Sequence, residues 1–98
     1  MRRECIAVYM MASQKNCTIY TGVTSHLIQR TYQHRTHAIE GFTKRYAVDL
    51  LVWYELHESM EVAIHRGKRI KKYTRAKKIE LIEQVNPAWK DLWEDIVG

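Results

Sequence analysis

The sequence predicts an α+β fold in which a three-stranded, mainly antiparallel sheet is flanked by helices on both faces. Residues 5–12 and 17–23 are rich in β-branched and aromatic side chains and are joined by a short polar segment, which is typical of a hairpin. Residues 49–55 are apolar at both odd and even positions, so both faces of that strand should be covered. The other segments show helical spacing, which gives the order β-β-α-β-α-α.

The hairpin determines which side chains share a face of the sheet. If the four residues after Ala12 form the loop, strand pairing puts Ala12 opposite Cys17 and Tyr9 opposite Tyr20. The two phenols should then lie side by side. The same register separates Cys5 from Cys17 by roughly 23 Å at ~3.3 Å per residue, which is too far for a disulfide. Both cysteines are therefore expected to be free thiols.

The first helix, predicted over about residues 26–37, carries a polar stripe. Thr24 or Ser25 can cap its start. Arg30 and His34 are spaced i, i+4 and should project from one side of the helix, in line with His26. The residues available for burial are Leu27, Ile28, Thr31 and Tyr32. The polar stripe should therefore face solvent or a site.

Two longer helices and a short final helix are predicted after the third strand. Ser59 can cap the first of them and Thr74 can begin the second. Asn86 and Pro87 should stop the second helix, since Asn-Pro is a common helix stop. The residues assigned to packing are Met60, Val62, Ala63, Ile64, Ile70, Ile79, Leu81, Ile82, Val85, Trp89, Leu92, Trp93 and Ile96.

Positive charge is concentrated in one segment. The net charge is +5, from 16 Lys and Arg against 11 Asp and Glu, and residues 65–78 contain no acid. Half of all the cationic residues lie there: Arg66, Lys68, Arg69, Lys71, Lys72, Arg75, Lys77 and Lys78. A polyanion would approach this side of the molecule. The alternative is that the run is only a solvated helix face.

Length and composition predict one folded domain over residues 1–98. The hydrophobic fraction of 46% and the charged fraction of 28% are typical of globular proteins and not of disordered ones. The apolar run at residues 5–12 is too short for a signal-peptide core with a cleavage site or for a membrane span. A cytoplasmic protein without a membrane partner is therefore expected. His26, His34 and His37 lack a CxxC or HExxH motif, which argues against a zinc site.

Taken together, these residues resemble the GIY-YIG nuclease superfamily, in particular its small stand-alone bacterial members. Ala7-Val8-Tyr9 stands where the family has its first triplet, and Tyr20-Thr21-Gly22 stands where it has the second. Arg30 follows Tyr20 by ten residues, as in the family. The likeness continues through residues 41–46, 49–55, 63–73 and 86–89 and so covers nearly the whole chain.

The resemblance implies hydrolysis of phosphodiesters, with Mg²⁺ or Mn²⁺ as a loosely held cofactor. Tyr20 would activate the attacking water with support from Tyr9, and a phenol of pKa ~10 would need a nearby cation to do so. Arg30 would bind the phosphate through its bidentate guanidinium, and His34 would orient the water or a phosphate oxygen. Without the resemblance, a cross-strand tyrosine pair is ordinary sheet packing and Arg30 is a solvated helix residue.

Three positions bear on how far the resemblance holds. The family's metal-binding glutamate falls at Gly67, where a helical glycine costs about 1 kcal/mol relative to alanine. Val23 stands where the family has a lysine, and Lys44 is considered as a substitute phosphate contact. Asn86 lies where related proteins carry an asparagine near the site, which is an alternative to its role as a helix stop.

Three classes of function therefore remain open. The first is a metal-dependent endonuclease for branched, damaged or single-stranded DNA, as in DNA repair or recombination. The second is a nucleic-acid-binding module without catalysis, and the third is a protein-interaction domain. Contacts to DNA, or to RNA, are expected from Lys44, Arg66, Lys68, Arg69, Lys71 and Lys72.

Gly67 carries a separate prediction about catalysis. Because a glycine offers no oxygen ligand, we expect no intact metal site at this position and little or no cleavage. Glutamate is a better helix residue than glycine, so Gly67→Glu is expected to leave the helix unharmed and to gain metal-dependent nicking.

Overall fold

Within the described residues, three antiparallel strands form the centre of the molecule: β1 (Ala7–Ala12), β2 (Ile19–Thr24) and β3 (Leu50–Leu56). This computed structural model describes residues 5–14, 17–38, 41 and 45–97. The strand order is β2-β1-β3, so β1 is central and β2 and β3 form the two edges. Every residue of β1 is buried, because side chains on both of its faces enter a core.

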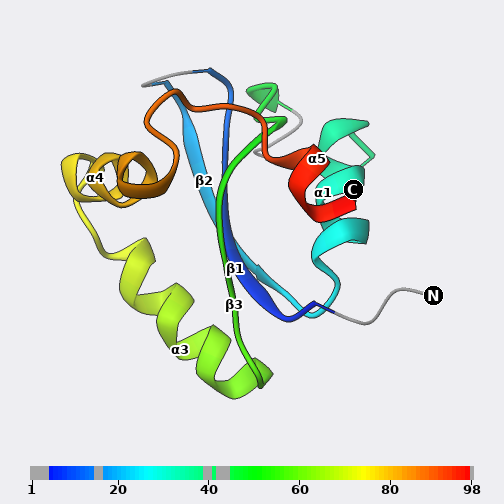
Figure 1. The fold of residues 1–98 in the computed structure, drawn as a ribbon, viewed down its shortest axis with the longest axis vertical. Helices are drawn as coiled ribbons and strands as arrows, with labels where there is room; N and C mark the ends of the chain where they lie inside the picture. The colour runs from blue at the N-terminus through cyan, green and yellow to red at the C-terminus, as the bar shows by residue number, and fades with distance from the viewer. Residues whose placement is uncertain (1–4, 15–16, 39–40, 42–44, 98) are drawn as a thin grey trace.

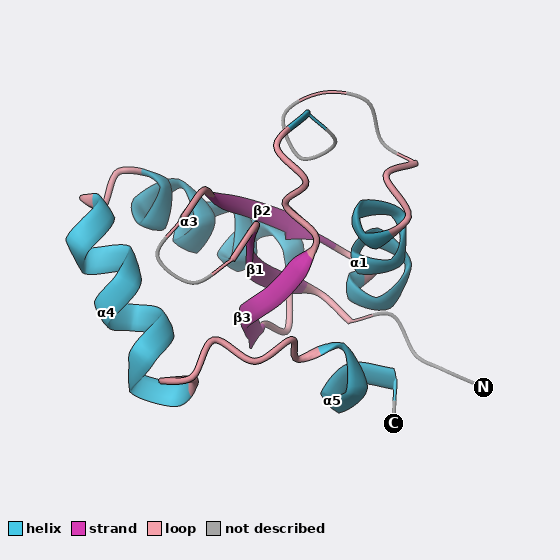
Figure 2. Ribbon diagram, turned by 90° about the horizontal axis from the view of Figure 1, so that it is seen from above, coloured by secondary structure: helices cyan, strands magenta, loops and turns pink. Residues whose placement is uncertain are grey.

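Helices cover both faces of the sheet, as predicted. Helices α1 (Leu27–Arg35) and α5 (Trp93–Val97) lie on one side, and α3 (Met60–Lys71) and α4 (Arg75–Val85) lie on the other (Figures 1 and 2). The core toward α3 and α4 includes Val8, Met10, Val52, Ala63, Ile70 and Ile82. The core toward α1 and α5 includes Ala7, Tyr9, Met11, Leu27 and Leu51. The predicted α+β fold class is therefore confirmed.

The register of the hairpin differs by two residues from the predicted one. Ala12 pairs with Ile19 and Tyr9 pairs with Gly22. The turn is longer than expected because the backbone N–H of Ser13 donates to the carbonyl of Thr18 at 3.1 Å. A shift of two residues leaves every side chain on its predicted face, since strand side chains alternate with a period of two. The predicted pairing is wrong, but the predicted face of each tyrosine is retained.

The ends of α3 and α4 follow the predicted capping residues. Ser59 Oγ accepts from the N–H of Val62 at 3.3 Å, and Thr74 Oγ1 accepts from the N–H of Lys77 at 3.2 Å. Helix α4 ends at Val85 with Asn86 as its C-terminal cap. Short polar side chains at these positions satisfy backbone donors that have no partner inside the helix.

Helix α1 differs from the prediction in its cap and in its buried stripe. Neither Thr24 nor Ser25 is the N-cap residue, which is His26; the Thr24 hydroxyl instead accepts from the N–H of His26 at 3.0 Å. The buried residues of α1 are Leu27, Thr31 and His34. Tyr32, expected to be buried, is 57% exposed. These three buried positions follow an i, i+4, i+7 spacing, which places His34 on the core side of the helix.

The apolar face of α3 is narrower than predicted. Its buried residues are Ala63, Gly67 and Ile70, whereas Val62 and Ile64 are exposed. Val85, at the end of α4, is exposed as well. Small residues at positions 63 and 67 let α3 lie close to the sheet, so the flanking apolar side chains project past the sheet.

Two contacts close the fold at the β3 side. Asn86 is buried; its side-chain amide donates to the carbonyls of Val52 at 3.0 Å and Lys90 at 2.9 Å, and its Oδ1 accepts from the N–H of Lys90 at 3.0 Å. Asp91, two residues before α5, forms an ion pair with Arg35 of α1. Asn86 therefore stops α4, as predicted, and fixes the following segment to β3.

Two further expectations concern the cysteines and the membrane. Neither Cys5 nor Cys17 forms a disulfide bond in the described part of the chain, as predicted. In the part of the chain that the structure describes, no helix has the length and apolar character needed to span a membrane.

Candidate functional site

Tyr9, Tyr20 and His34 form a cluster between the sheet and α1. Tyr9 Oη lies 2.9 Å from His34 Nε2 in a buried hydrogen bond. The ring of Tyr20 lies 6.3 Å from that of Tyr9 and 5.5 Å from that of His34, measured between centroids. The structure therefore brings together three of the four residues assigned to catalysis from the sequence.

Gly22 makes room for this cluster. A Cβ atom built on Gly22 would lie 2.5 Å from Tyr9 Oη, which is closer than atoms can pack. The phenol of Tyr9 therefore passes directly over the backbone of β2, and only glycine allows this approach. The close approach of the Tyr9 phenol thus explains why the Tyr20-Thr21-Gly22 triplet ends in glycine in this chain.

Burial sets the protonation of the Tyr9 and His34 pair. Burial raises the pKa of Tyr9 above its ordinary value, and Tyr20 adds to this effect while Arg30 opposes it. Burial, together with the positive charge of Arg30, lowers the pKa of His34 to about 4. At neutral pH the phenol is protonated and the imidazole is uncharged, so the Tyr9 O–H can donate to Nε2 with the imidazole proton on Nδ1.

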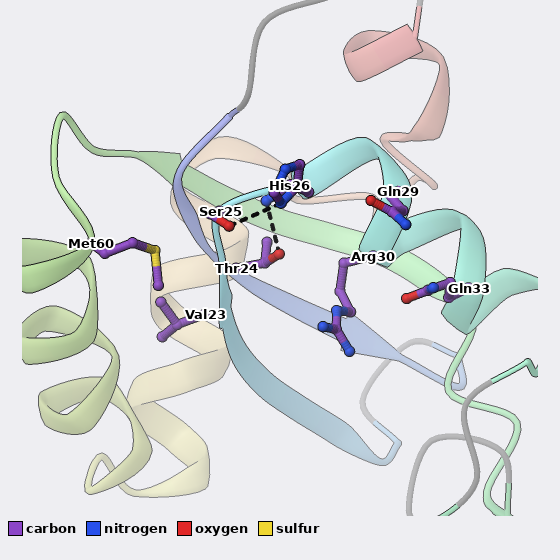
Figure 3. A pocket seen from close by; sticks show the side chains of 8 residues that line it. All are labelled: Val23, Thr24, Ser25, His26, Gln29, Arg30, Gln33 and Met60. Carbon is purple, nitrogen blue, oxygen red and sulfur yellow. Dashed lines mark hydrogen bonds between the residues drawn. The ribbon is translucent and has the colours of Figure 1, made fainter.

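Arg30 projects from the exposed face of α1 into a pocket at the edge of β2. The pocket has a volume of about 280 Å³ and is lined by Val23, Thr24, Ser25, His26, Gln29, Arg30, Gln33 and Met60 (Figure 3). Met60 belongs to α3, so the pocket extends around the edge of β2 from one face of the sheet to the other. A guanidinium in an open polar pocket is suited to bind a phosphate.

The i, i+4 spacing predicts that Arg30 and His34 share one exposed stripe. In the structure they do not. His34 is buried against Tyr9, whereas Arg30 is exposed in the pocket. The guanidinium is still close enough to lower the pKa of both His34 and Tyr9 electrostatically. The buried cluster and the open pocket are therefore neighbouring parts of one site.

Gly67 packs directly against a residue of this pocket. A Cβ atom on Gly67 would lie 2.3 Å from Cγ2 of Val23. The glycine is buried in α3 and allows the helix to approach β2 closely, which explains its presence within a helix despite its poor propensity. The expectation that Gly67→Glu would fit without cost to the helix is therefore wrong, because Val23 occupies the space.

The residues around Gly67 do not fit the metal that the family uses. Position 67 offers no oxygen atom, and the methyl group of Val23 lies where its side chain would begin. Among the described residues, no group of three or more His, Cys, Asp or Glu side chains is arranged to hold a metal ion. A hard divalent cation needs anionic oxygen ligands.

The basic segment divides into parts with different surroundings. Arg66 donates from Nε to Glu55 Oε1 at 2.9 Å, from Nη2 to Glu55 Oε2 at 3.3 Å, and from Nη1 to Tyr73 Oη at 3.4 Å. Its fork is thus occupied by a contact between α3 and β3. Lys68, Arg69, Lys71 and Lys72 are exposed. Lys44 lies outside the described residues.

The exposed cations of α3 point in two directions. At about 100° per residue, Lys71 lies about 20° and Lys68 about 80° around the helix from Met60, which lines the Arg30 pocket. Arg69 lies about 180° from Met60 on the same count. Lys68 and Lys71 therefore continue the pocket along α3, and Arg69 belongs to another face.

Sequence reasoning missed the polar wall of the pocket. Gln29 and Gln33 line it beside Arg30, and their side chains point toward it in Figure 3. Their i, i+4 spacing, with His26 three residues earlier, is the signal that could have found them. Met60 was assigned to packing, and nothing in its sequence context indicates a site.

Comparisons with known proteins identify the family of this chain. Residues 5–80 match the family model described as the GIY-YIG catalytic domain. A UPF0213 protein of Staphylococcus haemolyticus (strain JCSC1435) is 30% identical over 77 residues, which is 79% of this chain and 93% of that protein. No solved structure shows a significant match. The fold is of the nuclease type. The chain belongs to the GIY-YIG family.

Proposed function

We propose that this chain is a GIY-YIG-type nuclease domain that binds DNA along the edge of β2 and is built for phosphodiester hydrolysis. The observation that carries the proposal is the buried 2.9 Å hydrogen bond between Tyr9 and His34, placed beside the pocket that holds Arg30. A buried hydrogen-bonded pair that positions the neighbouring Tyr20, next to an open pocket with a guanidinium, supports phosphodiester chemistry, which needs a positioned proton acceptor and a cation for the phosphate.

Each side chain of the site has a separate role in this proposal. Arg30 binds two phosphate oxygens and stabilises the negative charge that gathers on the phosphate as water attacks. Tyr20 is half-buried, whereas Tyr9 is buried, so Tyr20 is the side chain that would accept a proton from the water, as a phenolate that has lost its own proton to solvent and is stabilised by Arg30. Tyr9 and the uncharged His34 hold each other in place behind Tyr20. His34 is then a positioning residue rather than a cation for the phosphate.

The binding surface extends from the pocket onto α3. Lys68, Lys71 and Lys72 are exposed and would contact backbone phosphates on the far side of the β2 edge from Arg30. Arg66 is left out of this surface because Glu55 and Tyr73 engage its guanidinium. Ammonium groups contact phosphates and do not read base edges, so little sequence preference is expected and RNA is an alternative ligand.

A second candidate is a nucleic-acid-binding module that does not cleave. The contact between Gly67 and Val23 favours it, because the family's carboxylate position is both empty of oxygen atoms and filled by a methyl group. In that case the pocket still binds a phosphodiester, but the departing 3′ oxygen lacks a stabilising counter-charge. Cleavage by the unmodified chain should then be slow or undetectable with Mg²⁺ or Mn²⁺.

Salt-dependent binding to double-stranded, branched and single-stranded DNA, and to matched RNA, tests the surface. The variant Lys68→Glu/Lys71→Glu/Lys72→Glu should lose most of the affinity and reduce the slope of log affinity against log salt by about 3, at ~0.9 for each lost phosphate contact. Lys90→Glu, an exposed charge reversal beside β3, is the control and should leave both unchanged. If the triple variant binds as tightly as the unmodified chain, α3 does not contact the backbone.

Cleavage of the same panel tests the assigned chemistry. Tyr20→Phe should leave binding unchanged and remove whatever cleavage the chain supports, whereas Arg30→Ala should weaken both. Equal cleavage by Tyr20→Phe would show that another group activates the water. Binding to a protein that survives high salt, with no binding to any nucleic acid, would instead favour a protein-interaction domain.

A further inference from the structure

The outer face of α3, centred on His65, carries a surface that turns away from the Arg30 pocket; of the proposed phosphate contacts, Lys72 lies toward its C-terminal end, about 20° around the helix from His65. A hollow of about 710 Å³ lies between the end of β3 and this face of the helix. Two of its lining residues, Leu56 and Val62, are 58% and 55% exposed. Exposed apolar side chains that line one hollow together with charged residues are consistent with an interaction surface.

The charges around this hollow are arranged symmetrically along the helix. Glu61 and Arg69 lie four residues before and four residues after His65, which is about 6 Å along the axis and about 40° around it in each direction. Both side chains are exposed. Among the ion pairs of the described residues, none includes Glu61 or Arg69, whereas Arg66 is paired with Glu55. Glu61 and Arg69 are therefore open to an external partner.

We propose that this surface binds a second copy of the chain, with the two α3 helices antiparallel and a two-fold axis at His65. In that arrangement Glu61 of each copy faces Arg69 of the other, so a single contact creates two ion pairs. A two-fold interface requires such self-complementary charge. Leu56 and Val62 would be covered at the margin of the contact.

Self-association explains this face better than a nucleic acid does. Glu61 would repel a phosphate backbone, whereas it faces a cation in the two-fold pairing. The contact also leaves the Arg30 pocket open, because Met60 lies about 140° around α3 from His65. The dimer therefore does not depend on the proposed function, and each can fail without the other.

Sedimentation equilibrium without nucleic acid tests the proposal, from about 1 μM to about 500 μM, a range that covers weak dimers. The unmodified chain should dimerise. Glu61→Arg and Arg69→Glu should each weaken dimerisation by about tenfold or more, because each places two like-charge pairs across the axis. An equimolar mixture of the two single variants should form heterodimers, and the double variant Glu61→Arg/Arg69→Glu should recover homodimers.

The recovery distinguishes a paired interface from general charge effects. Glu80→Arg on α4 and Lys90→Glu beside β3 are matched reversals on other surfaces and should not change dimerisation. Thermal unfolding of each variant verifies that it is folded. The proposal is overturned if the unmodified chain is a monomer throughout the range. It is also overturned if the single variants dimerise normally, or if neither the mixture nor the double variant recovers.

Discussion

A glutamate introduced at position 67 needs the space that Val23 occupies. A Cβ atom on Gly67 would lie 2.3 Å from Val23 Cγ2 but 3.9 Å from Val23 Cβ. Because carbon atoms pack at about 3.5–4.0 Å, the first contact is a severe overlap and the second is ordinary. Removing Cγ2 by Val23→Ala should therefore convert a position that excludes a side chain into one that accepts it.

The expected changes in the free energy of unfolding distinguish the Gly67→Glu variant from the Val23→Ala/Gly67→Glu variant. Gly67→Glu gains about 1 kcal/mol of helix propensity but overpacks the contact, at a typical cost of about 1–3 kcal/mol, so a net loss of up to about 2 kcal/mol is expected. Val23→Ala/Gly67→Glu removes the overlap. Val23 is half-buried, so losing its two methyl groups costs about 1 kcal/mol, which the helix gain offsets. Urea unfolding should rank the double variant close to the unmodified chain.

The same variant should gain activity that depends on metal. The new side chain would begin beside position 23, which lines the pocket that carries Arg30, and its carboxylate would supply an anionic oxygen for Mg²⁺ or Mn²⁺. We expect nicking of supercoiled DNA above the level of the unmodified chain. The matched control is Val23→Ala/Gly67→Gln, which has the same size without the charge and should not nick. Arg30→Ala in the glutamate background should abolish the gain.

Two outcomes would refute this reasoning at different steps. Equal stability of Gly67→Glu and the unmodified chain would show that Val23 moves aside freely and that the close packing has no energetic consequence. Nicking by the unmodified chain at the rate of the double variant would show that other residues hold the metal.

His34→Gln and Asn86→Ala provide two further tests. The folded-state pKa of His34 is lowered to about 4 from ~6.5, so the unfolded chain binds more protons between these values. The stability due to the uncharged imidazole is present above about pH 6.5 and is lost toward pH 4, by about 3 kcal/mol. The free energy of urea unfolding of His34→Gln should not show this loss. If His34→Gln and the unmodified chain have the same pH profile, the assignment to His34 is contradicted. Asn86→Ala leaves the Val52 carbonyl without its amide donor and should cost about 2–3 kcal/mol without changing DNA binding. Lost binding at normal stability would instead place Asn86 in the site.

The strands and capped helices could be predicted because their signals are local. Ser59 and Thr74 are caps at the expected positions, and the strand predicted at residues 49–55 is observed at Leu50–Leu56 with its central residues 51–53 buried. The hairpin register could not be predicted, because the turn lacks a two-residue Asn-Gly or Asp-Gly signal and is closed instead by Ser13 and Thr18. The period-two rule still kept both tyrosines on the correct face.

The burial of α1 was misassigned because it depends on distant partners. Polarity alone puts His34 outside and Tyr32 inside. The structure reverses this, because the Tyr9 hydroxyl gives the buried imidazole a hydrogen bond from a residue 25 positions away. Tyr32 lies near the ring of Trp93, with centroids 6.3 Å apart, on the surface. A partner that removes the cost of burying a polar group cannot be read from the helix sequence.

The basic segment shows the same limit for charge. Its eight cations lie close together in the sequence and so predict one patch. On a helix, however, each successive side chain is rotated by about 100° from the one before it. Arg66 is therefore bound to Glu55, Lys71 faces the pocket side, and Arg69 faces the hollow near β3. A count of charges predicts that a polyanion is attracted, and only the helix geometry indicates which cations are available to it.

The two departures from the family pattern, at positions 23 and 67, are in contact. The two positions form a single packing contact, because any side chain at position 67 would meet Val23 first. On the other face of β2, Gly22 is covered by Tyr9 in the same close manner. Adjacent residues of this strand thus contact α3 on one face and the Tyr9 phenol on the other. A substitution at position 67 therefore changes the free energy of unfolding through its contact with Val23. Its effects on stability and activity should not be additive with the effects of substitutions at position 23.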